Sequence, residues 1–160
     1  MTIAHNTVIA SGSRDALMAA GAGATPDRPK RVYNNLFLHT DRLPVYFVPA
    51  AGTNLISDGN LFWSPSTDEK QAAALFKKWQ ASPAFAENKK LYEAGSDSHS
   101  VVADPQLKEY VPGSGSAAID AGVEARFGGF DPTNKDDSGR PDIGAIPAGG
   151  QMFSVGRRAP

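Results

Sequence analysis

The stretch YNNLFLHT, residues 33–40, decides the fold because it has near-copies at AHNTVIAS (4–11) and SDGNLFWS (57–64). Each copy places an Asn before three mostly apolar residues, with a polar or turn-forming residue after them. The repeated amides are 29 and 25 residues apart and belong to Asn6, Asn35 and Asn60. Self-similarity with a period of this length is typical of solenoid proteins.

Each Asn-marked run is short and bounded by turn-forming residues, so it predicts a buried strand and not a helix. If each run is one rung of a parallel stack, successive rungs lie about 4.8 Å apart. Equivalent Asn side chains can then form a hydrogen-bonded ladder at the turn before the strand, and Asn tolerates the left-handed backbone that such a turn requires. The spacing alone leaves two interpretations open, a solenoid and a generic β protein in which three echoes arise by chance.

Other segments between the Asn-marked runs also have strand character. DALMAAG (15–21) and LPVYFVPAAG (43–52) are predicted as second sides of the same coils. GAGATPDRPK (21–30) is predicted as a loop at a corner, where solenoids accept insertions. Towards the C-terminus, short strands are expected between Gly, Pro and Asp turns: SVVAD (100–104), SAAID (116–120) and DIGAI (142–146).

Residues 66–81, STDEKQAAALFKKWQA, break the strand pattern and predict a helix. Ser66 and Glu69 have the spacing of a capping box, in which each side chain bonds the other residue's backbone N–H. The apolar stripe of this helix repeats at helical spacing and consists of Ala72, Leu75, Phe76 and Trp79. A Ser-Pro step ends the helix and starts a second, weaker one, so a helical insertion is expected at about 66–94.

The composition excludes several classes of function. The chain has 160 residues with 16 basic and 17 acidic side chains, and this balance argues against a nucleic-acid binder, which would be basic. It has no cysteine, so no disulfide or thiolate metal site can form, and no apolar run long enough to span a membrane. The first residues lack the basic start and apolar stretch of a signal peptide. Because they open directly in a strand pattern, we expect a chain that begins inside a larger exported protein rather than a cytoplasmic one.

Sequence motifs follow one another in a specific order: KKWQA (77–81), GSDSHSVVADPQL (95–107), GSGSAAIDAG (113–122) and DDSGRPDIGAI (136–146). This series resembles the C-terminal part of right-handed parallel β-helix proteins of the pectate-lyase-like superfamily, over roughly residues 3–146. The resemblance implies an all-β solenoid: a short right-handed parallel β-helix with one or two side helices and a C-terminal cap. The expected organisation is a truncated β-helix over 1–148, with its cap at about 97–148, and a flexible tail at 149–160.

The resemblance also implies a class of activity and a location. Enzymes of this kind are polysaccharide lyases and glycoside hydrolases that often act on acidic polysaccharides, outside the cell or in the periplasm, so a polysaccharide or oligosaccharide partner is implied. Members usually have many more coils, and their catalytic residues commonly lie on central coils that look missing here. Family activity therefore cannot be transferred residue by residue. The open rung edges at the N-terminal end favour pairing, in a homo-oligomer or with a missing N-terminal part.

The best candidate for catalysis on the coil segments is the sequence HTDR at 39–42. A polysaccharide lyase needs a base to remove the C5 proton of a uronate and a cation to neutralise its carboxylate. His39 is the candidate base and Arg42 the candidate cation, with Asp41 between them as a candidate substrate ligand. The alternative interpretation is a solvated corner after a buried strand.

Aromatic side chains can stack on sugar faces, and Tyr46 and Trp63 are the candidates for substrate binding. Trp79 is better explained by core packing, because it belongs to the apolar stripe of the predicted helix. His99 matches a recurring position of the family, and we expect it to be structural, with its imidazole bonding a backbone carbonyl of the neighbouring coil.

Calcium is the cofactor that the sequence brings into consideration. Asn134, Asp136 and Ser138, followed by a Gly, have spacings that resemble the start of a calcium loop. The bidentate acid expected at the end of the loop would be Ala145, so the pattern fails there. The alternative is an ordinary Asp-Asp-Ser-Gly turn in which Arg140 pairs with an Asp.

Two hypotheses of different classes remain. One is a polysaccharide-active enzyme, a lyase or hydrolase, working in a groove along the coils. The other is a non-catalytic module that caps, oligomerises or binds carbohydrate for a longer β-helix protein. The chain by itself favours the second, because few acid and base groups converge in its sequence.

Overall fold

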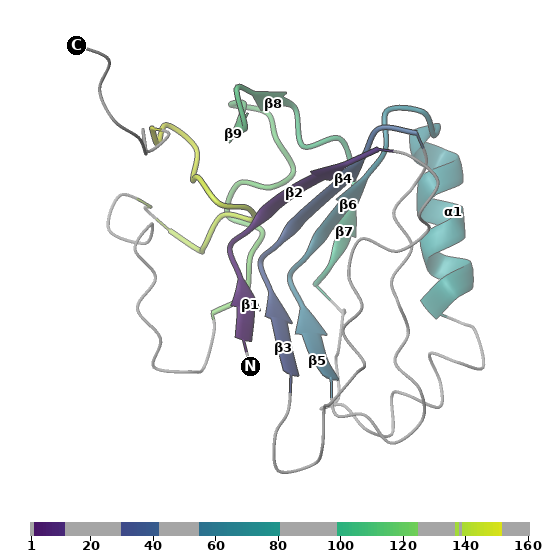
Figure 1. The fold of residues 1–160 in the computed structure, drawn as a ribbon, viewed down its shortest axis with the longest axis horizontal. Helices are drawn as coiled ribbons and strands as arrows, with labels where there is room; N and C mark the ends of the chain where they lie inside the picture. Colours follow the sequence, from purple (N-terminus) through teal and green to yellow (C-terminus); the bar gives the residue numbers. More distant parts are fainter. Residues whose placement is uncertain are drawn as a thin grey trace.

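A computed structural model describes residues 2–11, 30–41, 55–80, 99–124, 137 and 139–151. Within these ranges the chain is mostly β, and its larger sheets are parallel (Figure 1). One sheet has the order β1 (Thr2–Ala4), β3 (Lys30–Tyr33), β5 (Leu55–Asp58). The other has the order β2 (Thr7–Ala10), β4 (Leu36–His39), β6 (Leu61–Trp63), β7 (Val101–Val102).

Three strand–turn–strand units supply every strand of these two sheets except β7. Unit 1 is residues 2–10, unit 2 is residues 30–39 and unit 3 is residues 55–63, each with a two-residue turn between its strands. The units pair in parallel and in register, so that Val8, Phe37 and Phe62 occupy equivalent positions. The Asn-marked runs therefore form neighbouring strands of one parallel sheet, as the repeat predicted.

The turns of the three units share an unusual backbone conformation. The residue before each repeated Asn has a positive φ, at 52° for His5, 54° for Asn34 and 63° for Gly59. Gly has no Cβ to oppose this conformation, and Asn and His are among the side chains that enter it more often than others. The chain can therefore change direction in the same way three times.

The two central strands of the second sheet, β4 and β6, are largely buried on both faces. Successive residues of a strand point to opposite faces, so Leu36 and Leu61 share one face while Phe37 and Phe62 share the other. The two Phe rings stack with centroids 5.4 Å apart and an interplanar angle of 15°. Parallel sheets covered on both faces characteristically have such unbroken apolar strands.

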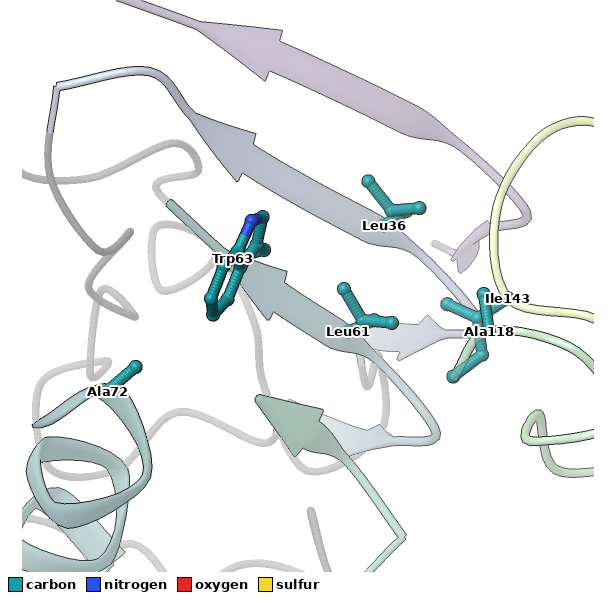
Figure 2. Close-up of a cluster of buried hydrophobic side chains, with 6 residues drawn as sticks. All are labelled: Leu36, Leu61, Trp63, Ala72, Ala118 and Ile143. Carbon is teal, nitrogen blue, oxygen red and sulfur yellow. The ribbon is translucent and has the colours of Figure 1, made fainter. Parts of the chain in front are cut away.

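The described hydrophobic core lies on the Leu36 face (Figure 2). It brings together the second sheet, the helix that follows β6 and the C-terminal part of the chain, through Leu36, Leu61, Trp63, Ala72, Ala118 and Ile143. In Figure 2 the two leucines lie on adjacent strands, with Ala118 and Ile143 at the end where those strands begin. The core thus joins segments that are far apart in the sequence.

The helix α1 (Glu69–Gln80) lies within the predicted helical segment and contacts β7. Its N-cap is Asp68, whose Oδ1 accepts the backbone N–H groups of Lys70 at 3.0 Å and Gln71 at 3.2 Å. The predicted capping box was wrong, because the Ser66 hydroxyl lies 2.8 Å from the Ser64 hydroxyl instead. Asp is as good a cap as Ser and adds a charge that suits the positive end of the helix.

Of the predicted apolar stripe, Ala72 is fully buried in the core. The side chains of Leu75, Phe76 and Trp79 lie outside what the structure describes, as do residues 81–98, where the second helix was predicted. Within the described part of the chain, no helix is long and apolar enough to cross a membrane.

After β7 the chain departs from the predicted strands. SVVAD contains β7, but SAAID and DIGAI form turns and bends, so those two strand predictions were wrong. The Ser116 hydroxyl accepts the N–H of Ala118 at 3.1 Å, a local bond that competes with strand pairing. A hairpin that was not predicted, β8 (Leu107–Lys108) with β9 (Val111–Pro112), precedes these turns.

Several predicted elements lie outside the described residues. These are the strands at 15–21 and 43–52, nearly all of the loop at 21–30 and the tail after residue 151. The strands that precede the Asn-marked runs of units 2 and 3 are β3 and β5, which were not predicted; they form the first sheet with β1.

Candidate functional site

A ladder of Asn side chains crosses the three turns. Asn6 Nδ2 donates to Asn35 Oδ1 at 2.9 Å, and Asn35 Nδ2 donates to Asn60 Oδ1 at 3.0 Å. The backbone N–H groups of Asn6 and Asn35 donate to the same two oxygens, at 3.1 and 3.0 Å. The predicted ladder is confirmed, and its bonds repeat identically from one unit to the next.

A Ser continues the ladder beside unit 3. The backbone N–H of Asn60 donates at 3.0 Å to the hydroxyl of Ser100, which directly precedes β7. The hydroxyl oxygen thus takes the place of an Asn Oδ1. Sequence reasoning missed this position because Ser carries no amide, although a short apolar run, Val101-Val102, follows it as in the other units.

The buried amides of the ladder also bond nearby carbonyls. Asn35 Nδ2 lies 2.9 Å from the carbonyl of Tyr33 and 3.1 Å from that of Ile3, and Asn60 Nδ2 lies 3.1 Å from that of Val32. Asn35 and Asn60 are both 0% exposed. Amide groups this deeply buried are stable only when they are hydrogen-bonded, and the ladder meets that requirement.

Asn34, which precedes the ladder residue of unit 2, holds a distant part of the chain. Its Nδ2 donates to the carbonyl of Val123 and its Oδ1 accepts the N–H of Val123, both at 2.8 Å. The same Nδ2 lies 3.2 Å from Nε2 of His5 in unit 1. One buried side chain therefore joins two units to a segment 89 residues away in the sequence.

The segment that Asn34 holds extends across all three turns. We name residues 116–124 and 139–147 the covering segment. It reaches unit 1 where the N–H of Ala145 donates to the Thr7 hydroxyl at 3.0 Å. At unit 3 it approaches Gly59 so closely that a Cβ there would lie 3.0 Å from the Val123 nitrogen.

Carboxylates bind the two parts of the covering segment together. Asp142, 4% exposed, accepts the N–H of Asp120 at 2.7 Å. Asp120 in turn accepts the backbone N–H of Arg140 at 3.0 Å, while the Arg140 guanidinium donates to the carbonyl of Gly122 at 2.8 Å. The alternative interpretation paired Arg140 with an Asp; among the described contacts its guanidinium bonds a carbonyl, and only its backbone N–H bonds an Asp.

The turn of unit 3 also carries an imidazole–carboxylate contact. His99 Nδ1 lies 2.8 Å from Asp58 Oδ2, and Asp58 Oδ1 accepts the backbone N–H of His99 at 2.8 Å. The His99 side chain is 58% exposed and that of Asp58 is 16% exposed. The expected partner of this imidazole was a backbone carbonyl, and the structure places a carboxylate there instead.

The residues predicted for catalysis are only partly described. His39 is the last residue of β4 and is 1% exposed, with Nδ1 accepting the N–H of Asp41 at 3.2 Å. Asp41 is exposed and accepts a hydrogen bond from the Thr40 hydroxyl at 3.0 Å. Arg42 and Tyr46 lie outside the described residues. In this arrangement the imidazole of His39 is enclosed by protein.

The other predicted binding residues are placed as follows. Trp63 is 9% exposed and belongs to the hydrophobic core, so its indole faces protein and not solvent. The calcium candidates Asn134, Asp136 and Ser138 lie outside the described residues. Across the ranges that the structure does describe, no three His, Asp or Glu side chains gather as a metal site would require.

The described contacts are thus mainly amide and backbone hydrogen bonds that hold strands and turns together. Searches among protein families, curated proteins and solved structures find no match for this chain. Its function is therefore inferred from geometry and sequence.

Proposed function

We propose that units 1–3 and β7 are successive coils of a short right-handed parallel β-helix, and that this chain serves as a terminal segment that closes such a stack. Parallel pairing in register supports this proposal, because neighbouring coils of a solenoid contact one another through equivalent residues. The ladder supports it further, because each unit bonds the next with the same atoms.

The observation that carries the closing role is that the covering segment contacts all three units. Repeats of a solenoid normally contact only their neighbours. The covering segment bonds Thr7 of unit 1 and Asn34 of unit 2, and it packs against Gly59 of unit 3. Such a segment links unit 1 to unit 3, which in the described sheets both pair with unit 2 and not with each other, and it opposes separation of the units, as a cap must do.

The wider function that we propose is taken from the sequence resemblance to polysaccharide lyases and glycoside hydrolases of the exported β-helix class. In that setting this chain is the C-terminal β-helix segment of a carbohydrate-active protein. A non-catalytic role for the segment itself fits the burial of His39 and Trp63, two of the side chains that catalysis or sugar stacking would expose.

A second candidate function is favoured by the contact between Asp58 and His99. A carboxylate that holds one imidazole nitrogen fixes the orientation of the ring, which is a common arrangement for a general base. More than half of the His99 side chain is exposed. This candidate is a lyase or hydrolase that acts on an acidic polysaccharide at the turn of unit 3.

Hydrogen exchange tests the closing role. The inter-unit bonds are reported by the amides of Leu36, Leu61 and Val101, which donate to the carbonyls of Asn6, Asn35 and Asn60. If the covering segment holds the units together, Asn34→Ala will speed exchange at all three amides. Lys108→Ala, on the exposed hairpin, is the matched control and will change none of them. Faster exchange at Leu36 alone would contradict the proposal.

Product release tests the second candidate. The chain is incubated with polygalacturonate and with alginate, and unsaturated products and new reducing ends are measured. The closing role predicts no release by the wild-type chain. Release that is lost in His99→Ala, with an unchanged circular dichroism spectrum, would establish the second candidate in place of the first.

A further inference from the structure

The hydrogen bonds of the ladder all run in one direction, from Asn6 to Asn35 to Asn60. The ladder therefore provides no donor for the Oδ1 of Asn6. Asn35 Oδ1 receives both donors of Asn6, and Asn60 Oδ1 receives both donors of Asn35. Asn6 gives its side-chain N–H groups to Asn35 and to the carbonyl of Ala4. Among the described residues no donor reaches Asn6 Oδ1, and the residue is exposed.

The backbone of β2 also has hydrogen-bonding groups on the side that faces away from β4. Among the described residues, β1 and β2 each lie at one edge of their sheets, and β5 and β7 lie at the opposite edges. The carbonyls of Asn6 and Ala10 accept the N–H groups of Leu36 and Thr40, so they face β4. Because backbone groups alternate between the two sides of a strand, Thr7 and Ile9 present their N–H and C=O groups to the open side.

An apolar position completes this edge. Ile9 is 43% exposed and occupies the position equivalent to Leu38 and Trp63 of the next two units. A unit added beside β2 would therefore need an apolar residue three positions after its Asn to continue this column. It would need an Asn to continue the ladder, and strands parallel to β1 and β2.

We infer that the edge formed by β1, the His5–Asn6 turn and β2 is a docking surface for one further parallel strand–turn–strand unit of the pattern Asn followed by three apolar residues. The side-chain and backbone N–H groups of its Asn bond Asn6 Oδ1. This inference rests on the proposed function, in which the units are coils. A two-fold contact between copies would place Asn6 Oδ1 against a second acceptor, so ladder chemistry selects the parallel unit.

A peptide of this chain has the required pattern and serves as the probe. It is KRVYNNLFLHTD, residues 30–41, labelled with fluorescein. Fluorescence anisotropy is measured as the full 160-residue protein is added. We expect saturable binding, and binding about tenfold weaker for the peptide with Asn35→Leu, the factor that corresponds to about 1.4 kcal/mol, one net hydrogen bond.

Two protein variants locate the binding. Ile9→Lys puts a charge on the edge, a change that opposes strand pairing at a side chain already partly exposed. Ala74→Lys adds the same charge to an exposed position of α1 and is the matched control. We expect Ile9→Lys to abolish peptide binding and Ala74→Lys to leave it unchanged, with the same circular dichroism spectrum for both.

Several results would overturn the inference: no binding, equal binding of the two peptides, or binding that Ile9→Lys leaves intact. A concentration-dependent mass in light scattering that Ile9→Lys abolishes would also overturn it, by placing a second copy on the edge. Hydrogen exchange of the peptide-free protein separates this failure from failure of the proposed function. Slow exchange at Leu36, Leu61 and Val101 without peptide binding would support the proposed stack of units and refute only the docking surface.

Discussion

Truncating the central rung of the ladder should destabilise the chain far more than truncating its open end. The change is Asn35→Ala, and the matched control is Asn6→Ala. Both remove the same amide from the same ladder, but Asn35 is 0% exposed whereas Asn6 is exposed. The comparison therefore sets a buried amide with two ladder neighbours against an exposed amide with one.

The magnitude follows from the contacts that are lost. The Asn35 side chain takes part in five hydrogen bonds, with Asn6, Asn60, Tyr33 and Ile3. A net contribution of about 0.5–1.5 kcal/mol each, taken at the low end because one NH₂ is shared among three acceptors, gives a loss of about 3 kcal/mol. Water can replace the partners of Asn6, so its loss should stay below about 1 kcal/mol.

Urea unfolding followed by tryptophan fluorescence measures both changes. Domains of this kind unfold with roughly 5–15 kcal/mol, so a loss of about 3 kcal/mol moves the midpoint clearly while the m-value stays constant. Equal losses for the two variants would refute the reasoning, because they would show that burial of the ladder does not set its contribution. A loss below about 1 kcal/mol for Asn35→Ala would do the same.

Further predictions concern turn residues and the helix cap, and the same urea unfolding measures the change in stability for each. Gly59→Ala should cost at least about 2 kcal/mol, since φ is +63° and the new Cβ would lie 2.6 Å from Asn34 Oδ1; Gly149→Ala, with φ +77° and no atom within 4 Å, should cost only about 1 kcal/mol. Asp68→Ala should cost about 1 kcal/mol through loss of the helix cap, whereas Ser66→Ala should change stability by less than about 0.5 kcal/mol, and the reverse order would restore the capping box. Tyr110→Gly should raise stability by about 0.5–1 kcal/mol, because the second turn residue of the hairpin has φ 70°; a loss would show that the exposed ring contributes more than the strain.

The ladder could be predicted from the sequence because everything it needs repeats along the chain. An Asn before a short apolar run at Asn6, Asn35 and Asn60 specifies a turn, a strand and a register. Parallel strands in register place identical side chains against each other, and Asn both donates and accepts. Ser100 could not be predicted in this way, because its hydroxyl, and not an amide oxygen, accepts the backbone N–H of Asn60.

The strands before the turns could not be predicted from their own residues. β3 reads KRVY and β5 reads LISD, and their equivalent positions Val32 and Ser57 share no apolar character. Such segments become strands because a neighbouring strand is there to pair with, and strand propensity depends on that context. The apolar Ile3 and Val32, each three residues before the repeated Asn, were the available signal, and Ser57 interrupts it.

By itself, the sequence determined the Asn-marked strands, their turns and the helix near residues 69–80, since neighbouring residues and a regular period specify these locally. Only the tertiary structure decided that Asn34 holds Val123, that Asp120 and Asp142 join the covering segment, and that His39 and Trp63 are enclosed. The bond between Asn34 and Val123, for example, joins groups that are 89 residues apart in the sequence. A backbone N–H or a carbonyl has the same chemistry at every residue, so no sequence pattern marks which one a distant side chain will bond.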